Sequence, residues 1–325
     1  MSIHPPVPYR SRERTPPYGR IALYAYERST MNRGIWYAVG AYMLWGILPI
    51  YWKALLHVSG VQITSHRIIW AFLILLIAVF VLRRGRELLS AGQNPRILLA
   101  YSATAILIAI NWGVYIWAVN ANLIIETSLG YYINPLLSVL VGVIVLRERL
   151  RSPQWLAIGI AAAGVIYLTL TYGRLPWVAL TLAFSFTIYA LIKKKIALDA
   201  FQGLTIETGV LLVPSLVLVL LSEAGGGGPF LSGDLRTTML LIGAGLATTA
   251  PPLLFVLAAQ RISLSLIGIL QYLSPTMQFL LDVFLYHEPF SHNQLIGFSL
   301  VWLALVVFGA ERLAAARARP AATSA

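Results

Sequence analysis

Ten apolar segments alternate with short polar connections along the chain, and this pattern predicts an all-α integral membrane protein. About 20 apolar residues in a helix cross a hydrocarbon core of about 30 Å. The runs are uninterrupted and lack the period-two alternation of barrel strands, which favours helices. The ten predicted transmembrane helices lie at 34–53, 62–82, 96–118, 124–146, 154–172, 174–193, 203–221, 237–259, 264–285 and 292–310.

Composition agrees with this pattern and excludes several kinds of protein. Of the 325 residues, 58% are apolar or aromatic and 11% are charged, against about a quarter charged in a soluble domain. The sequence contains no Cys, which excludes disulfides, thiolate metal sites and cysteine nucleophiles. We predict no cofactor and no metal site. Gly225–Gly228 lacks the Lys-Ser/Thr of a phosphate loop, and His287 and His292 are five residues apart with Pro289 between them.

The positions of the basic residues predict the orientation in the membrane. With the N-terminus inside, 20 of the 24 Lys and Arg residues fall on the inner side, and Lys53, Arg67, Arg174 and Arg236 fall on the outer side. The positive-inside rule therefore predicts a multi-pass protein of the cell (inner) membrane with both termini cytoplasmic. The basic charge serves membrane orientation, so we expect lipid and no nucleic acid as partner. Residues 1–30 are predicted to be a disordered tail, and residues 313–325 a short cytoplasmic tail.

An internal repeat divides the chain into two halves of five helices. At an offset of 140 residues, Tyr132-x-x-Pro135 matches Tyr272-x-x-Pro275, and Glu148 matches Glu288. Because five is odd, the second half enters the membrane in the opposite sense, as in secondary transporters whose substrate site lies between inverted repeats. We predict repeats at 31–173 and 174–312.

The middle of the membrane is the predicted substrate site. Pro135 and Pro275 lie at the centres of their helices and free the carbonyls of Tyr131 and Gln271 from helical hydrogen bonds. A simple packing kink is the alternative interpretation. Aromatic faces with a few amides suit a small amphipathic substrate. The predicted substrate-binding residues are Asn111, Trp112, Tyr115, Tyr131, Tyr132, Asn134, Pro135, Gln271, Tyr272 and Pro275.

Several stretches resemble a known family. AYMLWGILPIYWK, NWGVYIWAVN, ETSLGYYINPLLSVLVG and TTAPPLLFVLAAQRISLSLIGILQYLSPT are similar to the RarD-type branch of the EamA, or drug/metabolite transporter, superfamily. The resemblance extends from about Met31 to Arg312. It implies a ten-helix inner-membrane permease built from two five-helix EamA repeats, and it favours export as the direction.

Ionisable residues at membrane depth are candidates for gating and coupling, because such residues are costly in hydrocarbon. The candidates are His66, Arg67, Glu126, Glu207 and Asp282. Pairing of Arg67 with Glu126 would form an outer gate that protons could open, with protons as coupling ion. Snorkelling to the interface is the alternative. The sequence thus predicts a secondary active transporter that works by alternating access and is not an enzyme. An intramembrane lipid-modifying enzyme is the alternative, and the oligomeric state is open.

Overall fold

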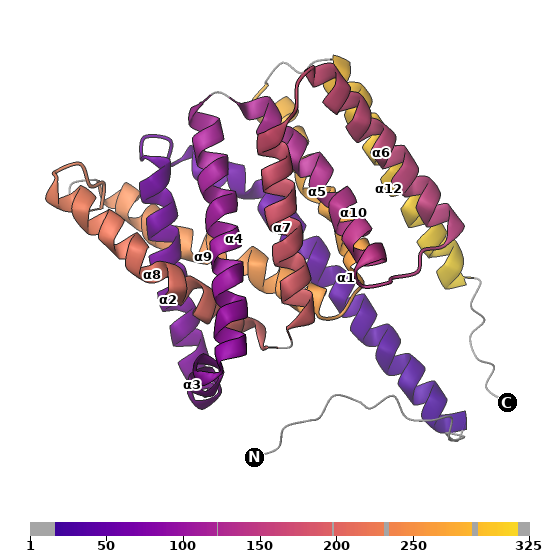
Figure 1. Ribbon diagram of the computed structural model, residues 1–325, viewed down its shortest axis with the longest axis horizontal. Coiled ribbons are helices and arrows are strands. Elements are labelled where there is room, and N and C mark those ends of the chain that lie inside the picture. Colours follow the sequence, from indigo (N-terminus) through magenta and orange to yellow (C-terminus); the bar gives the residue numbers. More distant parts are fainter. Residues whose placement is uncertain (1–16, 122, 197, 231–233, 288–291, 318–325) are drawn as a thin grey trace.

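The computed structural model describes residues 17–121, 123–196, 198–230, 234–287 and 292–317, and these residues form helices joined by short connections (Figure 1). The helices are α1 (Pro17–Lys53), α2 (Gly60–Val81), α3 (Gly85–Gln93), α4 (Pro95–Asn120), α5 (Ile124–Ile144), α6 (Ser152–Tyr172), α7 (Trp177–Lys195), α8 (Ala200–Ala224), α9 (Leu235–Ala259), α10 (Leu264–Gln271), α11 (Leu273–Leu280), the π-helix η1 (Leu281–Leu285) and α12 (His292–Arg317).

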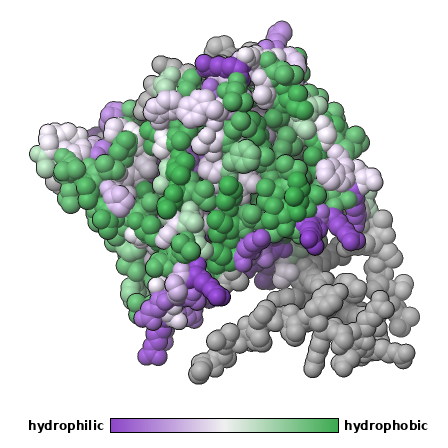
Figure 2. Space-filling model, in the orientation of Figure 1, coloured by the Kyte–Doolittle hydropathy of each residue, from purple (hydrophilic) through white to green (hydrophobic). Residues whose placement is uncertain are grey.

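The helices have the length and surface of a membrane bundle. Within the described residues, nine of them are long and apolar enough to cross a membrane, and α12 contains a shorter apolar stretch, Leu295–Glu311. Figure 2 shows apolar residues covering the helix faces, with hydrophilic residues gathered toward the ends of the bundle. The prediction of an all-α membrane protein is confirmed, while the count of ten spans remains a prediction.

Two segments differ from the sequence prediction. Helix α1 begins at Pro17, so 17–30 is helical although it was predicted to be disordered. In Figure 1 this part of α1 extends beyond the bundle. Residues 1–16 and 318–325 lie outside the described residues. The short helix α3 was not predicted, because its nine residues carry only two Leu and lie largely exposed between α2 and α4.

Eight helical segments form a closed ring. Following neighbouring contacts, the order is α1, α9, α2, α8, α4, α7, α5 and then α10–α11, which packs back on α1. Helices α6 and α12 pack on each other at one side of this ring (Figure 1). We call the end of the bundle that holds α3 the α3 end, and the other the opposite end.

The ring has the symmetry of two inverted repeats. In the repeat, α1 corresponds to α7, α2 to α8, α4 to α9, α5 to α10–α11, and α6 to α12. Contacts of α2 with α8, α5 with α10 and α6 with α12 join each segment to its own equivalent, as a two-fold axis requires. Equivalent residues also share backbone geometry: Arg147 and His287, which are 140 residues apart, both have positive φ, 55° and 53°.

Glycines allow the equivalent helices to approach closely. A Cβ on Gly268 of α10 would lie 2.6 Å from the Pro135 carbonyl oxygen of α5. Similarly, a Cβ on Gly297 of α12 would lie 2.5 Å from a Leu168 methyl of α6. Small residues are the usual means of packing membrane helices, so these contacts hold the two repeats together.

Candidate functional site

A cavity of about 500 Å³ occupies the middle of the helix ring, and every segment of the ring contributes to its wall. At the opposite end it reaches the connection between α1 and α2, where it is lined by Leu56, Val58 and Gly60. Toward the α3 end it stops at Leu204 and Glu207. Its wall is rich in aromatic rings, so it offers an apolar, partly enclosed site for a small organic molecule.

Seven of the ten predicted substrate-binding residues line this cavity: Asn111, Trp112, Tyr115, Tyr131, Asn134, Gln271 and Pro275. The side-chain amides of both asparagines also bond to α7, and Asn134 accepts from the Thr187 hydroxyl at 3.0 Å. Asn111 donates to the Leu182 carbonyl and to the Ser185 hydroxyl, both at 2.9 Å. The hydrogen-bonding capacity of the two asparagine side chains is thus partly used within the protein.

Two polar atoms of the wall have no hydrogen-bond partner among the described residues. They are the hydroxyl of Tyr42, whose side chain is 1% exposed, and Oε1 of Gln271. Buried polar atoms normally have a partner. A bound molecule in the cavity could supply the missing partners.

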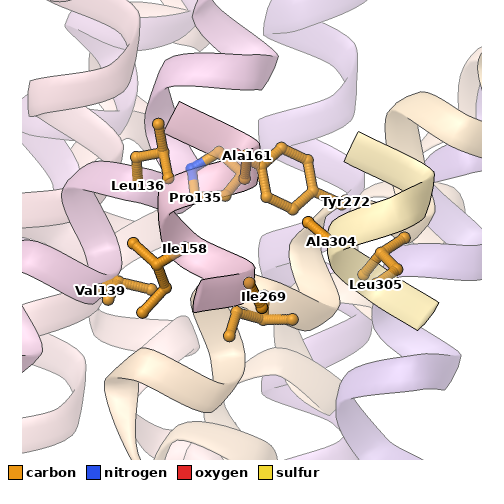
Figure 3. Close-up of a pocket in the computed structure, with 10 residues that line it drawn as sticks. Pro135, Leu136, Val139, Ile158, Ala161, Ile269, Tyr272, Ala304 and Leu305 are labelled. Carbon is orange, nitrogen blue, oxygen red and sulfur yellow. The ribbon is translucent and has the colours of Figure 1, made fainter. Parts of the chain in front are cut away.

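Tyr132, Pro135 and Tyr272 are not among the residues that line this cavity, and their predicted role in substrate binding stays a prediction. Pro135 and Tyr272 border a separate apolar gap of about 10 Å³ between the ring and the α6–α12 pair (Figure 3). The Tyr272 hydroxyl donates to the Tyr132 carbonyl at 3.1 Å across the repeat axis. Adjacent helix positions point about 100° apart, so Tyr131 faces the cavity while Tyr132 packs on Phe298. In this structure Tyr132, Pro135 and Tyr272 take part in the packing between the repeats.

The α3 end of the cavity is closed by aromatic rings. Tyr42 and Trp45 of α1 meet Phe186 and Tyr189 of α7, with Phe255 of α9 between them; their ring centroids are 5.6 to 6.4 Å apart. Phe255 is fully buried. These five aromatic side chains join three helices of the bundle, α1, α7 and α9, and they separate the cavity from the α3 end.

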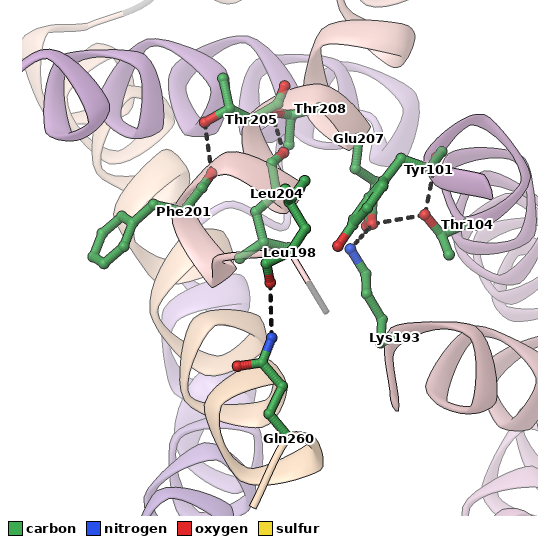
Figure 4. Close-up of polar contacts among 10 residues, drawn as sticks. All are labelled: Tyr101, Thr104, Lys193, Leu198, Phe201, Leu204, Thr205, Glu207, Thr208 and Gln260. Carbon is green, nitrogen blue, oxygen red and sulfur yellow. Dashed lines mark hydrogen bonds and ion pairs between the residues drawn. The ribbon is translucent and has the colours of Figure 1, made fainter. Parts of the chain in front are cut away.

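A buried ion pair lies beneath these rings. The Lys193 ammonium of α7 contacts the Glu207 carboxylate of α8, and the Thr104 hydroxyl of α4 donates to the same carboxylate at 3.0 Å (Figure 4). The Tyr101 ring centroid lies 4.4 Å from the ammonium. The side chains of the pair are 1% and 6% exposed. Glu207 also lines the cavity.

Further polar contacts reinforce the closure at the α3 end. The Lys194 ammonium donates to the carbonyls of Ala259 and Ile262 at 3.1 and 2.5 Å. An ion pair joins Arg84, after α2, to Asp199, before α8. These contacts tie α7 to α9 and α2 to α8 at the end that the cavity does not reach.

Arg67 of α2 lies in the cavity wall, held by aromatic and hydroxyl groups. Its guanidinium carbon lies 4.5 Å from the ring centroids of both Trp52 and Trp112. Its Nε donates to the Thr248 hydroxyl at 2.7 Å. In the part of the chain that the structure describes, no carboxylate lies within salt-bridge distance of Arg67.

The predicted pairing of Arg67 with Glu126 is not found, because Glu126 is held by other groups. It accepts from the Tyr172 hydroxyl at 2.6 Å and from the Val178 amide at 3.1 Å, and Arg174 lies 3.6 Å away. Its side chain is 2% exposed and caps the first turn of α7. A carboxylate at a helix N-terminus is a stabilising arrangement, so Glu126 joins the two repeats at the opposite end.

Of the remaining gating candidates, His66 is not among the residues that line the cavity. His66 is 3% exposed, and its ring stacks on Phe230 at a centroid distance of 5.0 Å. The side chain of Asp282 lies outside the described residues. The enzyme alternative depended on a weak cluster of His66, Arg67, Glu126 and Asp282, and within the described residues Glu126 is held by Tyr172, Val178 and Arg174 and not by Arg67.

Sequence reasoning missed Lys193 and Thr248. Lys193 belongs to a run of three lysines that was interpreted only as an orientation signal. Its match to Lys53 at the repeat offset was the available clue to a buried role. Thr248 had no signal in the sequence, because a single hydroxyl on an apolar helix is usually bonded to its own backbone.

Comparison with known proteins agrees with this architecture. The profile of the EamA-like transporter family matches residues 32–170 and 175–310. Protein RarD of Streptomyces exfoliatus is 43% identical over 87% of this chain and 90% of its own length. The uncharacterized transporter YojE of Bacillus subtilis is 43% identical over 87% and 95%, and Protein RarD of Escherichia coli is 40% identical over 85% and 94%.

A solved structure shares the fold. It is 18% identical in sequence and superposes with a TM-score of 0.64 over 84% of this chain and 96% of its own. The family profile and the relatives agree, and the resemblance seen in the sequence is confirmed. This chain belongs to the EamA-like transporter family, within its RarD branch.

Proposed function

We propose that this protein is a secondary active transporter that exports a small amphipathic organic molecule across the inner membrane by alternating access. The observation that carries the proposal is the aromatic cavity inside a closed ring of eight helical segments, reaching one end of the bundle and sealed at the other. A site at mid-membrane with access from one side is what alternating access requires.

The charge distribution supports an orientation for this cavity. Connections at the α3 end carry Arg83, Arg84 and Arg86, and the runs at 147–151 and 193–195 lie at the same end. We infer that the α3 end and both termini are cytoplasmic. The cavity then faces outward, and the aromatic rings with the Lys193–Glu207 pair form the closed inner gate.

We further propose that Glu207 couples transport to protons. Glu207 lines the cavity, and its carboxylate is held by Lys193 and Thr104, with the Tyr101 and Tyr189 rings beside the ammonium. A proton arriving from the outside would neutralise the carboxylate and remove its attraction for Lys193. The inner gate would then open, the proton would leave to the cytoplasm, and substrate would bind in exchange.

Single cysteines test the outward-facing cavity without background, because the chain has no native Cys. Thr64 lines the cavity, whereas its neighbour Ser65 is 2% exposed and does not. In intact cells, a membrane-impermeant maleimide should label Thr64→Cys and Arg236→Cys but not Ser65→Cys or Arg86→Cys. Labelling of Arg86→Cys in place of Arg236→Cys would overturn the orientation.

Transport itself is tested in proteoliposomes with an imposed pH gradient. A thermal-shift screen of metabolites and antibiotics would identify ligands for the flux measurement. Chloramphenicol belongs in the screen, because a relative from Pseudomonas aeruginosa, 29% identical over 86% of this chain and 94% of its own length, is named a chloramphenicol-sensitive protein. Absence of flux for every ligand that stabilises the protein would overturn the transporter proposal.

A further inference from the structure

We propose that Arg67 is the anchor for a single carboxylate on the transported molecule, so that the substrate is an organic monoanion with an aromatic or apolar body. This inference rests on the proposed transport function and names the substrate class of the same cavity.

Among the residues that the structure describes, the cavity wall includes one base and one acid with formal charge, Arg67 and Glu207. The negative charge of Glu207 is matched by Lys193. The positive charge of Arg67 has no carboxylate opposite it in the described part of the chain. The cavity therefore presents one positive charge without a counter-charge, and a buried ion without a partner is unfavourable.

The contacts of Arg67 fix the plane of the guanidinium. Thr248 binds Nε, and the faces of Trp52 and Trp112 lie on the guanidinium at 4.5 Å. An arginine side chain has five N–H donors, and the hydrogen bond to Thr248 uses one of them. Two indole faces hold the plane of the group, so the terminal nitrogens are ordered before a ligand arrives.

A carboxylate matches this group in shape and in charge. Its two oxygens can accept parallel hydrogen bonds from the planar guanidinium, an arrangement in which arginine is favoured over lysine. A monoanion balances the single free charge, whereas a phosphate dianion would need a second cation. The other nearby cation, Lys193, is already paired with Glu207.

The other side chains of the cavity wall indicate which groups the ligand would carry besides its carboxylate. Trp45, Tyr131 and Phe186 offer aromatic faces to an apolar or planar group. The free hydroxyl of Tyr42 and the free Oε1 of Gln271 can bond one additional polar group. A small aromatic carboxylate combines these features.

The test compares carboxylates with amides of the same shape on the purified, full-length protein in detergent. The probes are phenylacetate and indole-3-acetate, each with its primary amide, and the measurements are thermal stabilisation and the Kd from titration. At least one carboxylate should bind about tenfold or more tightly than its amide, because the amide loses the charged bidentate contact. Equal binding, or no binding of either carboxylate, would overturn the assignment.

Variants locate the preference at Arg67. Arg67→Gln should abolish the preference for carboxylates, and Arg67→Lys should restore part of it, since the charge returns without the planar donor pair. Arg236→Gln is the matched control, because this arginine is exposed in the first turn of α9, outside the cavity. An unchanged preference in Arg67→Gln would overturn the assignment. The comparison of ligands on unaltered protein stands even where a variant fails to fold.

Flux measurements in proteoliposomes distinguish a failure of the anion site from a failure of the transport proposal. Proteoliposomes that bind the carboxylates but do not move them would refute transport and support the anion site. Proteoliposomes that move neutral compounds while carboxylates neither bind nor compete would support transport and refute the anion site.

Discussion

Replacing Glu207 with Gln should destabilise the protein strongly, because it leaves the Lys193 ammonium buried without a counter-charge. The substitution keeps the shape of the side chain and its contact with the Thr104 hydroxyl. In the structure the Lys193 side chain is 1% exposed, so water does not reach the ammonium that the substitution leaves without its carboxylate. Lys193→Met produces the converse defect, a buried carboxylate without its cation.

The burial of the pair sets the expected size of the effect. Removing one partner of a buried ion pair costs about 3 to 5 kcal/mol, whereas replacing both partners with uncharged groups costs much less. At about 2 °C per kcal/mol for a chain of this size, each single variant should unfold about 6 to 10 °C earlier. The double variant Lys193→Met with Glu207→Gln should unfold at a higher temperature than either single variant.

Thermal unfolding of the purified proteins in one detergent measures these differences as a double-mutant cycle. Lys195→Met is the matched control, because this lysine lies two positions further along α7 and is exposed. It should unfold within about 1 °C of the original protein, as surface substitutions have small effects. Additive losses in the double variant, or an unchanged unfolding temperature in Glu207→Gln, would refute the argument that these charges stabilise each other.

Two other substitutions test contacts between the repeats. Glu148 accepts hydrogen bonds from the amides of Leu264 and Ser265 at the start of α10, at 2.7 and 2.8 Å, so Glu148→Gln should lower the free energy of unfolding by about 1 to 3 kcal/mol. Unfolding by denaturant measures this loss, and an unchanged midpoint would show that the cap is dispensable. Gly268→Val should reduce the yield of folded protein, because its side chain would meet the α5 backbone, whereas Gly159→Ala has no atom within 4 Å and should fold normally. Size-exclusion profiles would distinguish them, and equal profiles would contradict the close approach of α5 and α10.

The helices and the repeat could be predicted because they depend on properties that lie along the sequence. An apolar run of about 20 residues has few alternatives to a membrane helix. Motifs that recur at one spacing indicate the two-fold symmetry of the repeats. In the structure, a hydrogen bond joins the equivalent residues Tyr132 and Tyr272. Polar and aromatic residues near the centres of the predicted helices were also visible in the sequence, and most of the residues chosen on that basis line the cavity.

The direction of each side chain around its helix could not be predicted. In an apolar helix buried on several sides, no amphipathic stripe distinguishes the cavity face from the packing face. Tyr131 and Tyr132 were therefore treated alike, although one faces the cavity and the other faces α12. The partner of Glu126 was misjudged for the same reason, since sequence places Arg67 and Arg174 on the same side of the membrane.

Arg67 and Glu207, the two charged residues of the described cavity wall, occupy equivalent positions in the two repeats. Their places at different ends of the cavity fit the separate roles that they have in the proposed cycle. Arg67 and Glu207 are 140 residues apart and occupy α2 and α8, which pack on each other across the two-fold axis. Because the repeats are inverted, one position lies toward the opposite end and the other toward the α3 end. Opposite charges at these equivalent positions make the cavity electrically asymmetric although the fold is symmetric. In the proposed cycle Arg67 is kept without a carboxylate for the anionic substrate, and Glu207 is paired with Lys193 at the proposed inner gate.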